Sequence, residues 1–278
     1  RQILWVTYYR NLYNATHPSE INSPVSLSRN LLAWNQPGTN GLILPVNPSA
    51  SFLSILFANE LWFTLGDMTM AEHCAMLSMI FSPRNSGSRM IKRLAEINLV
   101  NGDDEAALKY LRILDKTLLH KSWAEKRIPG QQTPRVKEWL EKKRRDIPTQ
   151  DQLRSGNDAV TSLQNLVASN AGNLRAYEYL LCYHLLSKDL RSFVDDYVPG
   201  KVSSPIFAEA LLIHLARQGN IRAEELIKYQ IPVEIAKEFT DYTRLYEAKD
   251  TSLKEKYGQT YWFYYHFATT EPGKESKP

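Results

Sequence analysis

The fold is decided by residues 54–119, SILFANELWFTLGDMTMAEHCAMLSMIFSPRNSGSRMIKRLAEINLVNGDDEAALKYLRILDKTLL. A helix-turn-helix pattern occurs twice in this stretch, and its turn glycines, Gly66 and Gly102, stand 36 residues apart. One helical hairpin cannot bury its apolar face alone, so a repeat of this period predicts hairpins that stack against one another. We therefore predict an all-α fold, a tetratricopeptide-like stack of helical hairpins (a solenoid) with an irregular N-terminal segment.

Small residues and prolines around the glycines support this prediction. Ala95 before Gly102 and Ala107 after it would let two antiparallel helices approach closely. Pro83 falls where the second helix of the first hairpin should end, because proline lacks an N–H and disfavours helix just before itself. Asn59 places an amide at a position that usually packs tightly. We expect Asn59 to find a buried partner or to mark a loosened contact.

Several runs in and around the repeats resemble a family of uncharacterised membrane proteins from bacteria of the Bacteroides group. These runs are NELWFTLG (59–66), KRLAEINLVNG (92–102), ALKYL (107–111), TLL (117–119), WA (123–124) and TYWFYY (260–265). The resemblance implies an amino-terminal half with several membrane spans, followed by a soluble tetratricopeptide-like half of about this length. It implies a membrane tether on an unspecified side of the membrane, and it brings no catalytic residues.

Composition and charge narrow the classes of function. The chain has 278 residues, and its 34 basic and 30 acidic side chains leave a formal charge of +4, too small and too evenly spread to favour nucleic acid. The run Lys142-Lys143-Arg144-Arg145 has glutamates at helical spacing, Glu138 and Glu141, so we interpret it as a solvated helix face. No run of 18 apolar residues is present, so we expect no membrane-spanning segment in this chain. The first residue is arginine, so we interpret the chain as a fragment or processed product.

Motifs for metal, cofactor or nucleophilic chemistry are absent from the sequence. The histidines have no metal-ligand spacing, and no catalytic serine elbow or phosphate-binding glycine loop occurs. We expect no cofactor and no metal. Cys74 and Cys182 lie in apolar helical patterns, which favours buried free thiols over a disulfide.

We expect one helical-repeat domain over residues 1–278. Its parts in order are irregular helices and loops (1–49), two clear repeats (50–124), an insertion or hinge (125–157), weaker repeats with an aromatic closing helix (158–270) and a disordered tail (271–278). The hinge is indicated by Pro129-Gly130 and Pro148, which flank one short basic helix.

The register of the repeat predicts which side chains line the concave groove of the stack. These are Leu53, Leu56, Glu60 and Phe63 in the first repeat, Arg89, Lys92, Glu96 and Leu99 in the second, and Arg175 and Glu178, with Glu209 and Arg217 further on, in the weaker repeats. Glu60 and Glu96 take equivalent places on adjacent helices. Such a pair could do acid–base work on a sugar, but neutralisation by Lys92 and Arg89 in a surface ion-pair network is the favoured interpretation.

The closing helix carries the densest aromatic stretch of the chain. Its rings include Tyr257, Tyr261, Trp262, Tyr264 and Tyr265. We interpret these rings as core that closes the end of the stack; the alternatives are a platform for carbohydrate and a contact to a membrane half.

These features favour a non-catalytic interaction or scaffold module in a membrane-anchored bacterial protein. The expected partner is a protein or peptide segment, or the protein's own membrane half. The alternative is a carbohydrate-active hydrolase that uses Glu60 and Glu96.

Overall fold

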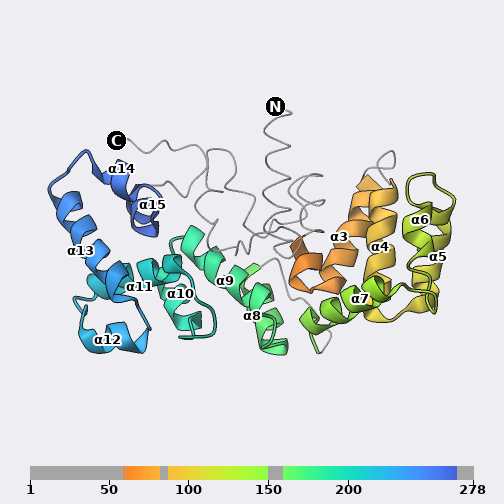
Figure 1. The fold of residues 1–278 in the computed structure, drawn as a ribbon, viewed down its shortest axis with the longest axis horizontal. Coiled ribbons are helices and arrows are strands. Elements are labelled where there is room, and N and C mark those ends of the chain that lie inside the picture. The colour runs from red at the N-terminus through yellow and green to blue at the C-terminus, as the bar shows by residue number, and fades with distance from the viewer. Residues whose placement is uncertain (1–58, 60, 82–86, 150–158, 268–278) are drawn as a thin grey trace. The chain divides into compact units, whose positions relative to one another are not determined.

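The structure, a computed structural model, describes residues 59, 61–81, 87–149 and 159–267 (Figure 1). The regular elements of these residues are all helices, with no strand among them, so the predicted all-α class is confirmed. The expected N-terminal elements and the expected disordered tail lie outside the described residues.

The chain divides into two compact units. The central unit comprises residues 45–177, and the terminal unit has 178–267 as its described residues. The single helical-repeat domain over residues 1–278 stays a prediction.

Helices of the central unit pack as close neighbours along the chain. A helix that ends at Leu65 is followed by α3 (Met68–Phe81), α4 (Ser88–Asn101), α5 (Asp104–Asp115), α6 (Lys121–Glu125), α7 (Pro134–Asp146) and α8 (Ala159–Ser169), and α9 (Leu174–Leu186) begins here and runs into the terminal unit. Helix α4 packs against α3, α5 and α7, and α5 packs against α6. The two predicted helix-turn-helix connections are therefore present, whereas a wider tetratricopeptide-like stack stays a prediction.

The turn glycines have the conformation that their position requires. Gly66 and Gly102 have φ of 92° and 82°, in the left-handed region where a Cβ is unfavourable. An aspartate follows each glycine and starts the next helix: Asp67 Oδ1 accepts from the amide of Met70 (2.8 Å), and Asp103 Oδ1 accepts from the amide of Ala106 (2.9 Å). Each turn thus ends one helix and caps the next.

The core of the central unit joins the hairpins. Small and medium side chains make it up: one cluster holds Ala95, Leu111, Leu114 and Ala124, and another holds Ala75, Met90 and Leu94. Tyr110 packs against both clusters. The alanines keep the helices close, as the sequence predicted.

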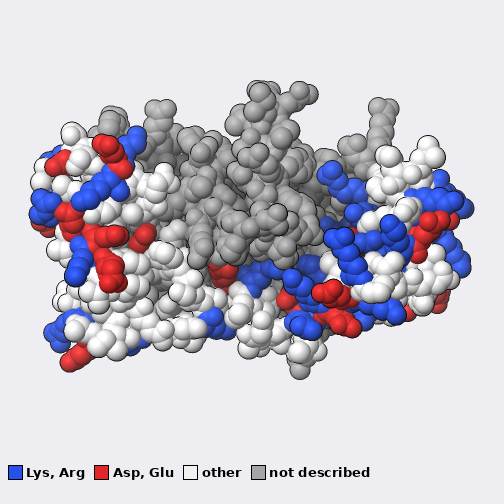
Figure 2. Space-filling model, in the orientation of Figure 1, with Lys and Arg blue, Asp and Glu red and all other residues white. Residues whose placement is uncertain are grey.

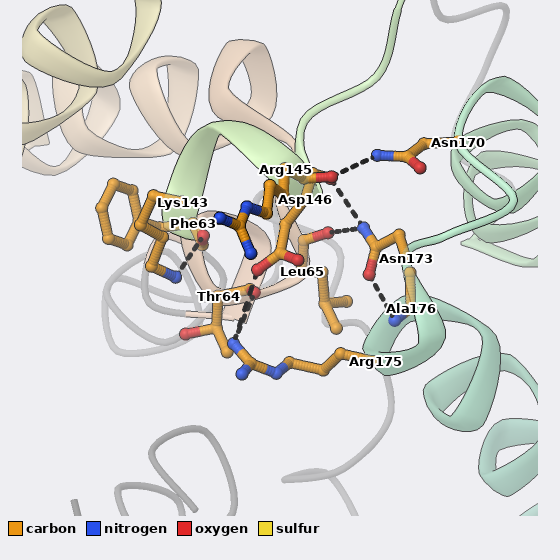
Figure 3. Close-up of polar contacts among 10 residues, drawn as sticks. All are labelled: Phe63, Thr64, Leu65, Lys143, Arg145, Asp146, Asn170, Asn173, Arg175 and Ala176. Carbon is orange, nitrogen blue, oxygen red and sulfur yellow. Dashed lines mark hydrogen bonds and ion pairs between the residues drawn. The ribbon is translucent and has the colours of Figure 1, made fainter. Parts of the chain in front are cut away.

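A polar junction links helix ends that are far apart in the sequence (Figure 3). Asn173, just before α9, donates from Nδ2 to the carbonyls of Leu65 (2.7 Å) and Asp146 (2.8 Å) and accepts from the amide of Ala176 (3.0 Å). One buried amide therefore caps the start of α9 and satisfies the ends of two other helices.

Basic side chains complete the capping of these helix ends. Lys143 donates to the Phe63 carbonyl (3.4 Å), and Arg144 donates to the carbonyls of Leu99 (2.8 Å) and Val100 (3.0 Å) at the end of α4. The basic run of α7 is thus partly used inside the fold, since cations stabilise helix C-termini. The segment expected to be an insertion or hinge is attached to the repeats by these bonds.

The terminal unit is centred on α11 (Pro205–Arg217). Its other helices are α10 (Leu190–Asp196), α12 (Ala223–Lys228), α13 (Val233–Glu247), α14 (Leu253–Tyr257) and α15 (Tyr261–Phe267). Helix α11 is buried along most of its length and packs against α10, α13 and α15. Asp241 of α13 accepts hydrogen bonds from Lys256 and from the Tyr257 hydroxyl (2.7 Å), which attaches α14 to α13.

Candidate functional site

Polar residues of α4 form the best candidate surface in the central unit. The helical period places Arg89, Lys92 and Glu96 on one side, while Leu94 and Ile97 are buried on the other. Arg89 is exposed, and Lys92 and Glu96 are half-buried. These three predicted groove residues therefore share a solvent-accessible face.

Leu99 does not lie on this face, although the register placed it there. It is buried, and its carbonyl accepts a hydrogen bond from Arg144 of α7. The repeat pattern carries no information that α7 packs against α4, so it could not place Leu99 in the core.

Glu96 is neutralised by a residue that the sequence reasoning missed. Its carboxylate lies 3.2 Å from Nη1 of Arg93, one turn earlier on α4, rather than pairing with Lys92 or Arg89. Nε of Arg93 donates to Oδ1 of Asn59 (3.2 Å), whose Nδ2 donates to the Ala71 carbonyl (2.6 Å). Asn59 thus has the buried partner that we expected, and the i, i+3 spacing of Arg93 and Glu96 was the available signal.

Phe63 belongs to the interior and not to a groove. The ring is buried under the guanidinium of Arg93 (3.8 Å to the ring centroid) and the ammonium of Lys143 (4.7 Å), and it stacks on Trp139 (6.4 Å between centroids). These cations cover the ring face that an open groove would expose. The other predicted residues of the first repeat, Leu53, Leu56 and Glu60, lie outside the described residues.

Trp123 adds an aromatic surface beside the α4 cations. Nζ of Lys92 lies 4.9 Å from the centroid of its ring, and the guanidinium of Arg127 lies 4.1 Å from it. Burial lowers the pKa of Arg127, the Glu96 carboxylate opposes that shift, and Arg135 adds to it. Nε of Arg127 is buried and has no hydrogen-bond acceptor among the described residues.

We define the α4 face as Arg89, Lys92, Arg93, Glu96, Trp123 and Arg127. Around it, residues 87–149 hold 15 lysines and arginines against 9 aspartates and glutamates, a larger excess than the 34 and 30 of the whole chain. Figure 2 shows Lys and Arg side chains gathered over the part of the central unit that carries α4 to α7. The basic residues are thus more concentrated than the overall charge suggested.

The predicted groove residues Arg175 and Glu178 both have contacts or neighbours within the fold. Arg175 donates to the Thr64 carbonyl (3.3 Å) and lies 4.0 Å from Asp146, so it belongs to the polar junction (Figure 3). Glu178 is half-buried near Cys182, and its charge adds to the effect of burial in raising the pKa of that thiol.

Glu209 and Arg217 both bond to the aromatic α15 of the terminal unit. The Glu209 carboxylate accepts from the backbone amide of Tyr261 (2.5 Å), and Arg217 donates to the Tyr265 hydroxyl (2.7 Å). Both side chains therefore help to position α15.

Aromatic residues of α14 and α15 are mostly core. Tyr257, Tyr261, Trp262 and Tyr264 are buried, and Tyr265 is half-buried. The hydroxyls of Tyr261 and Tyr264 donate to the carbonyls of Leu185 and Leu186 (2.8 Å each), and Trp262 Nε1 donates to the Glu209 carbonyl (2.9 Å). Rings held in this way offer little free face for stacking on a sugar.

The described residues contain no group of His, Cys, Asp and Glu that could hold a metal ion. Cys74 and Cys182 are buried free thiols, which confirms the interpretation of the two cysteines. Burial raises the pKa of Cys182, which leaves this thiol in its unreactive protonated form.

Comparison with known proteins places the chain in a family. The model of a family of unknown function, DUF6057, matches residues 26–268. The chain belongs to this family. No curated protein and no solved structure gives a match. Within the part that the structure describes, no helix of this DUF6057 member is long and apolar enough to cross a membrane.

Proposed function

We propose that the central unit is a non-catalytic interaction module whose α4 face binds an acidic segment of a partner protein. The observation that supports this most is the placement of Lys92 and Arg127 against the ring of the half-exposed Trp123, with Arg89 exposed one turn before Lys92 on α4. The one carboxylate of the α4 face, Glu96, is already paired with Arg93. The net positive charge of the face is therefore available to a ligand.

The chemistry of these side chains favours a peptide carboxylate. Arginine donates charge-assisted hydrogen bonds to carboxylates, and Arg89 of the α4 face is exposed to solvent. Trp123 is half-exposed, unlike the buried Phe63, and its exposed part supplies an apolar surface for an aliphatic neighbour in the same segment. An acidic segment with interspersed aliphatic residues satisfies both requirements.

The test is a fluorescence anisotropy titration with labelled synthetic peptides in which Glu alternates with Leu and Ala. Wild-type protein should bind these peptides, and the same peptides with Gln in place of Glu should bind weakly. The double variant R89E/K92E should lose about tenfold or more in affinity, because both cations that it reverses lie on the α4 face.

A matched control is the double variant K109E/R112E, which reverses the same two residue types at exposed positions of α5. This variant should keep an affinity close to that of wild type. Equal loss in both double variants, or equal binding of the Glu and Gln peptides, would show that the α4 face is not the site.

The proposal has a second part, that the module forms a tetratricopeptide-like stack tethered to a membrane. Its support is the sequence resemblance together with the two helix-turn-helix connections at Gly66 and Gly102. Fractionation of native cells tests the tether: the full-length protein should sediment with membranes and resist extraction by high salt. The hydrolase alternative stays a prediction, because Glu60 lies outside the described residues.

A further inference from the structure

The turn between α5 and α6 presents two adjacent leucines to solvent. Leu118 and Leu119 have exposed fractions of 102% and 90%, the largest of any big apolar side chain in the described residues. Exposure of two neighbouring apolar side chains is unfavourable in water, and none of the residues that the structure describes covers them. We name residues 116–121 the Leu118–Leu119 tip.

Hydrogen bonds hold the tip in a defined turn. Thr117 donates from its hydroxyl to the Leu114 carbonyl (2.7 Å), and that hydroxyl accepts from the amide of His120 (3.3 Å). The backbone amide of Lys121 donates to the Thr117 carbonyl (3.1 Å). The leucines are thus projected by an ordered turn that is tied to α5.

Lysines flank the two leucines of the tip, and the segments on either side of it carry more basic than acidic residues. Lys116 and Lys121 flank the leucines and are exposed, and residues 109–127 hold six lysines and arginines against two acidic residues. Of these acids, Glu125 lies 4.0 Å from Lys121 with both side chains exposed, which makes a weak pair. Figure 2 shows the basic side chains over this end of the central unit.

We propose that the Leu118–Leu119 tip inserts into the surface of an anionic lipid bilayer. A convex apolar tip with a basic surround matches such a surface, because the leucines enter the acyl boundary while the lysines meet the phosphate groups. A second copy of the chain fits less well, since it would bring the same positive charge against these lysines. The tip shares no residue with the α4 face, and the inference stands whether or not that face binds peptide.

Vesicle co-sedimentation tests the inference. The protein should bind vesicles of equal parts phosphatidylglycerol and phosphatidylcholine and should not bind vesicles of phosphatidylcholine alone. The double variant L118S/L119S should bind the anionic vesicles about 10- to 100-fold more weakly, and K116E/K121E about tenfold or more weakly.

The matched control is I227S/V233S, which removes two apolar side chains that are 77% and 57% exposed in the terminal unit. It should bind like wild type. Absence of wild-type binding to anionic vesicles, or equal weakening in I227S/V233S and L118S/L119S, would overturn the inference.

A fluorescent probe tests insertion of the tip itself. The variant L119C is labelled with the environment-sensitive dye NBD, which should spare Cys74 and Cys182 because both are buried. Anionic vesicles should shift its emission to the blue and raise its intensity, while I227C labelled in the same way should not respond. A response from both positions, or from L119C without vesicles as protein concentration rises, would refute insertion and indicate contact elsewhere or self-association.

Discussion

Comparing the loss of stability when each turn glycine is replaced by alanine separates the cost of backbone strain from the cost of a steric clash with another helix. Gly66 and Gly102 both have positive φ, 92° and 82°, and both end the first helix of a hairpin. A Cβ at Gly102 would meet no atom within 4 Å. A Cβ at Gly66 would overlap the carbonyl oxygen of Asp146, at the end of α7, and lie 3.2 Å from Nδ2 of Asn173.

G66A should therefore lose several times more free energy of unfolding than G102A. G102A carries the cost of a left-handed alanine alone, about 1 kcal/mol. G66A carries the same cost, and it must also displace the end of α7 and with it the bonds of Asn173 to the carbonyls of Leu65 and Asp146. Overpacking and buried carbonyls left without donors bring the expected loss to about 3–5 kcal/mol.

Urea unfolding followed by far-ultraviolet circular dichroism measures both free energies. The midpoint should fall much further for G66A than for G102A, with similar slopes if two-state behaviour holds. Equal losses, near 1 kcal/mol each, would refute the close approach of α7 to the Gly66 turn and with it the polar junction of Figure 3.

Two other substitutions test buried polar groups. N173D keeps the acceptor for α9 but turns the donor toward the carbonyls of Leu65 and Asp146 into an acceptor, so it should cost about 3–5 kcal/mol of unfolding free energy; a loss below about 1 kcal/mol would contradict the junction. Burial raises the pKa of Glu209 to about 7, against about 4.3 in an unfolded chain. Between these two pKa values the folded protein keeps this proton while the unfolded chain loses it. The contribution of Glu209 to the free energy of unfolding is therefore fully present below about pH 4 and falls by about 3 kcal/mol as pH rises to about 7. E209Q should flatten that fall in urea unfolding at about pH 5 and about pH 8, and parallel profiles of wild type and variant would contradict it.

Local features of the fold were predictable because the sequence encodes them over short distances. The glycines at the hairpin turns, the alanines between the helices and the aromatic rings of α15 follow from turn chemistry and burial. The turn at position 66 has a left-handed backbone, which favours glycine whatever packs nearby, so the role of Gly66 could be predicted without tertiary information.

Contacts between residues far apart in the sequence determine which of the predicted groove side chains are buried, and these contacts could not be predicted from the local pattern. Leu99 and Phe63 have the spacing of groove residues, yet α7 and its basic side chains cover them. The run from Lys142 to Arg145 suggested a solvated face, because nothing local indicates that Lys143 and Arg144 cap helices 44 to 80 residues earlier. The exposure of Leu118 and Leu119 could not be predicted either, since an apolar pair at the end of a helix normally indicates burial in the core.

The measurement that tests the α4 face most directly is site-specific photo-crosslinking in native cells. Benzoylphenylalanine is placed at Gly87, an exposed position before α4 with φ of −65° that any residue can adopt, so every cation of the face is kept. The proposed function predicts a discrete adduct whose crosslinked segment, sequenced by mass spectrometry, is acidic, and which is lost with R89E/K92E and absent from the control position Arg112. The same adducts from both positions, or a crosslinked segment without acidic residues, would contradict it.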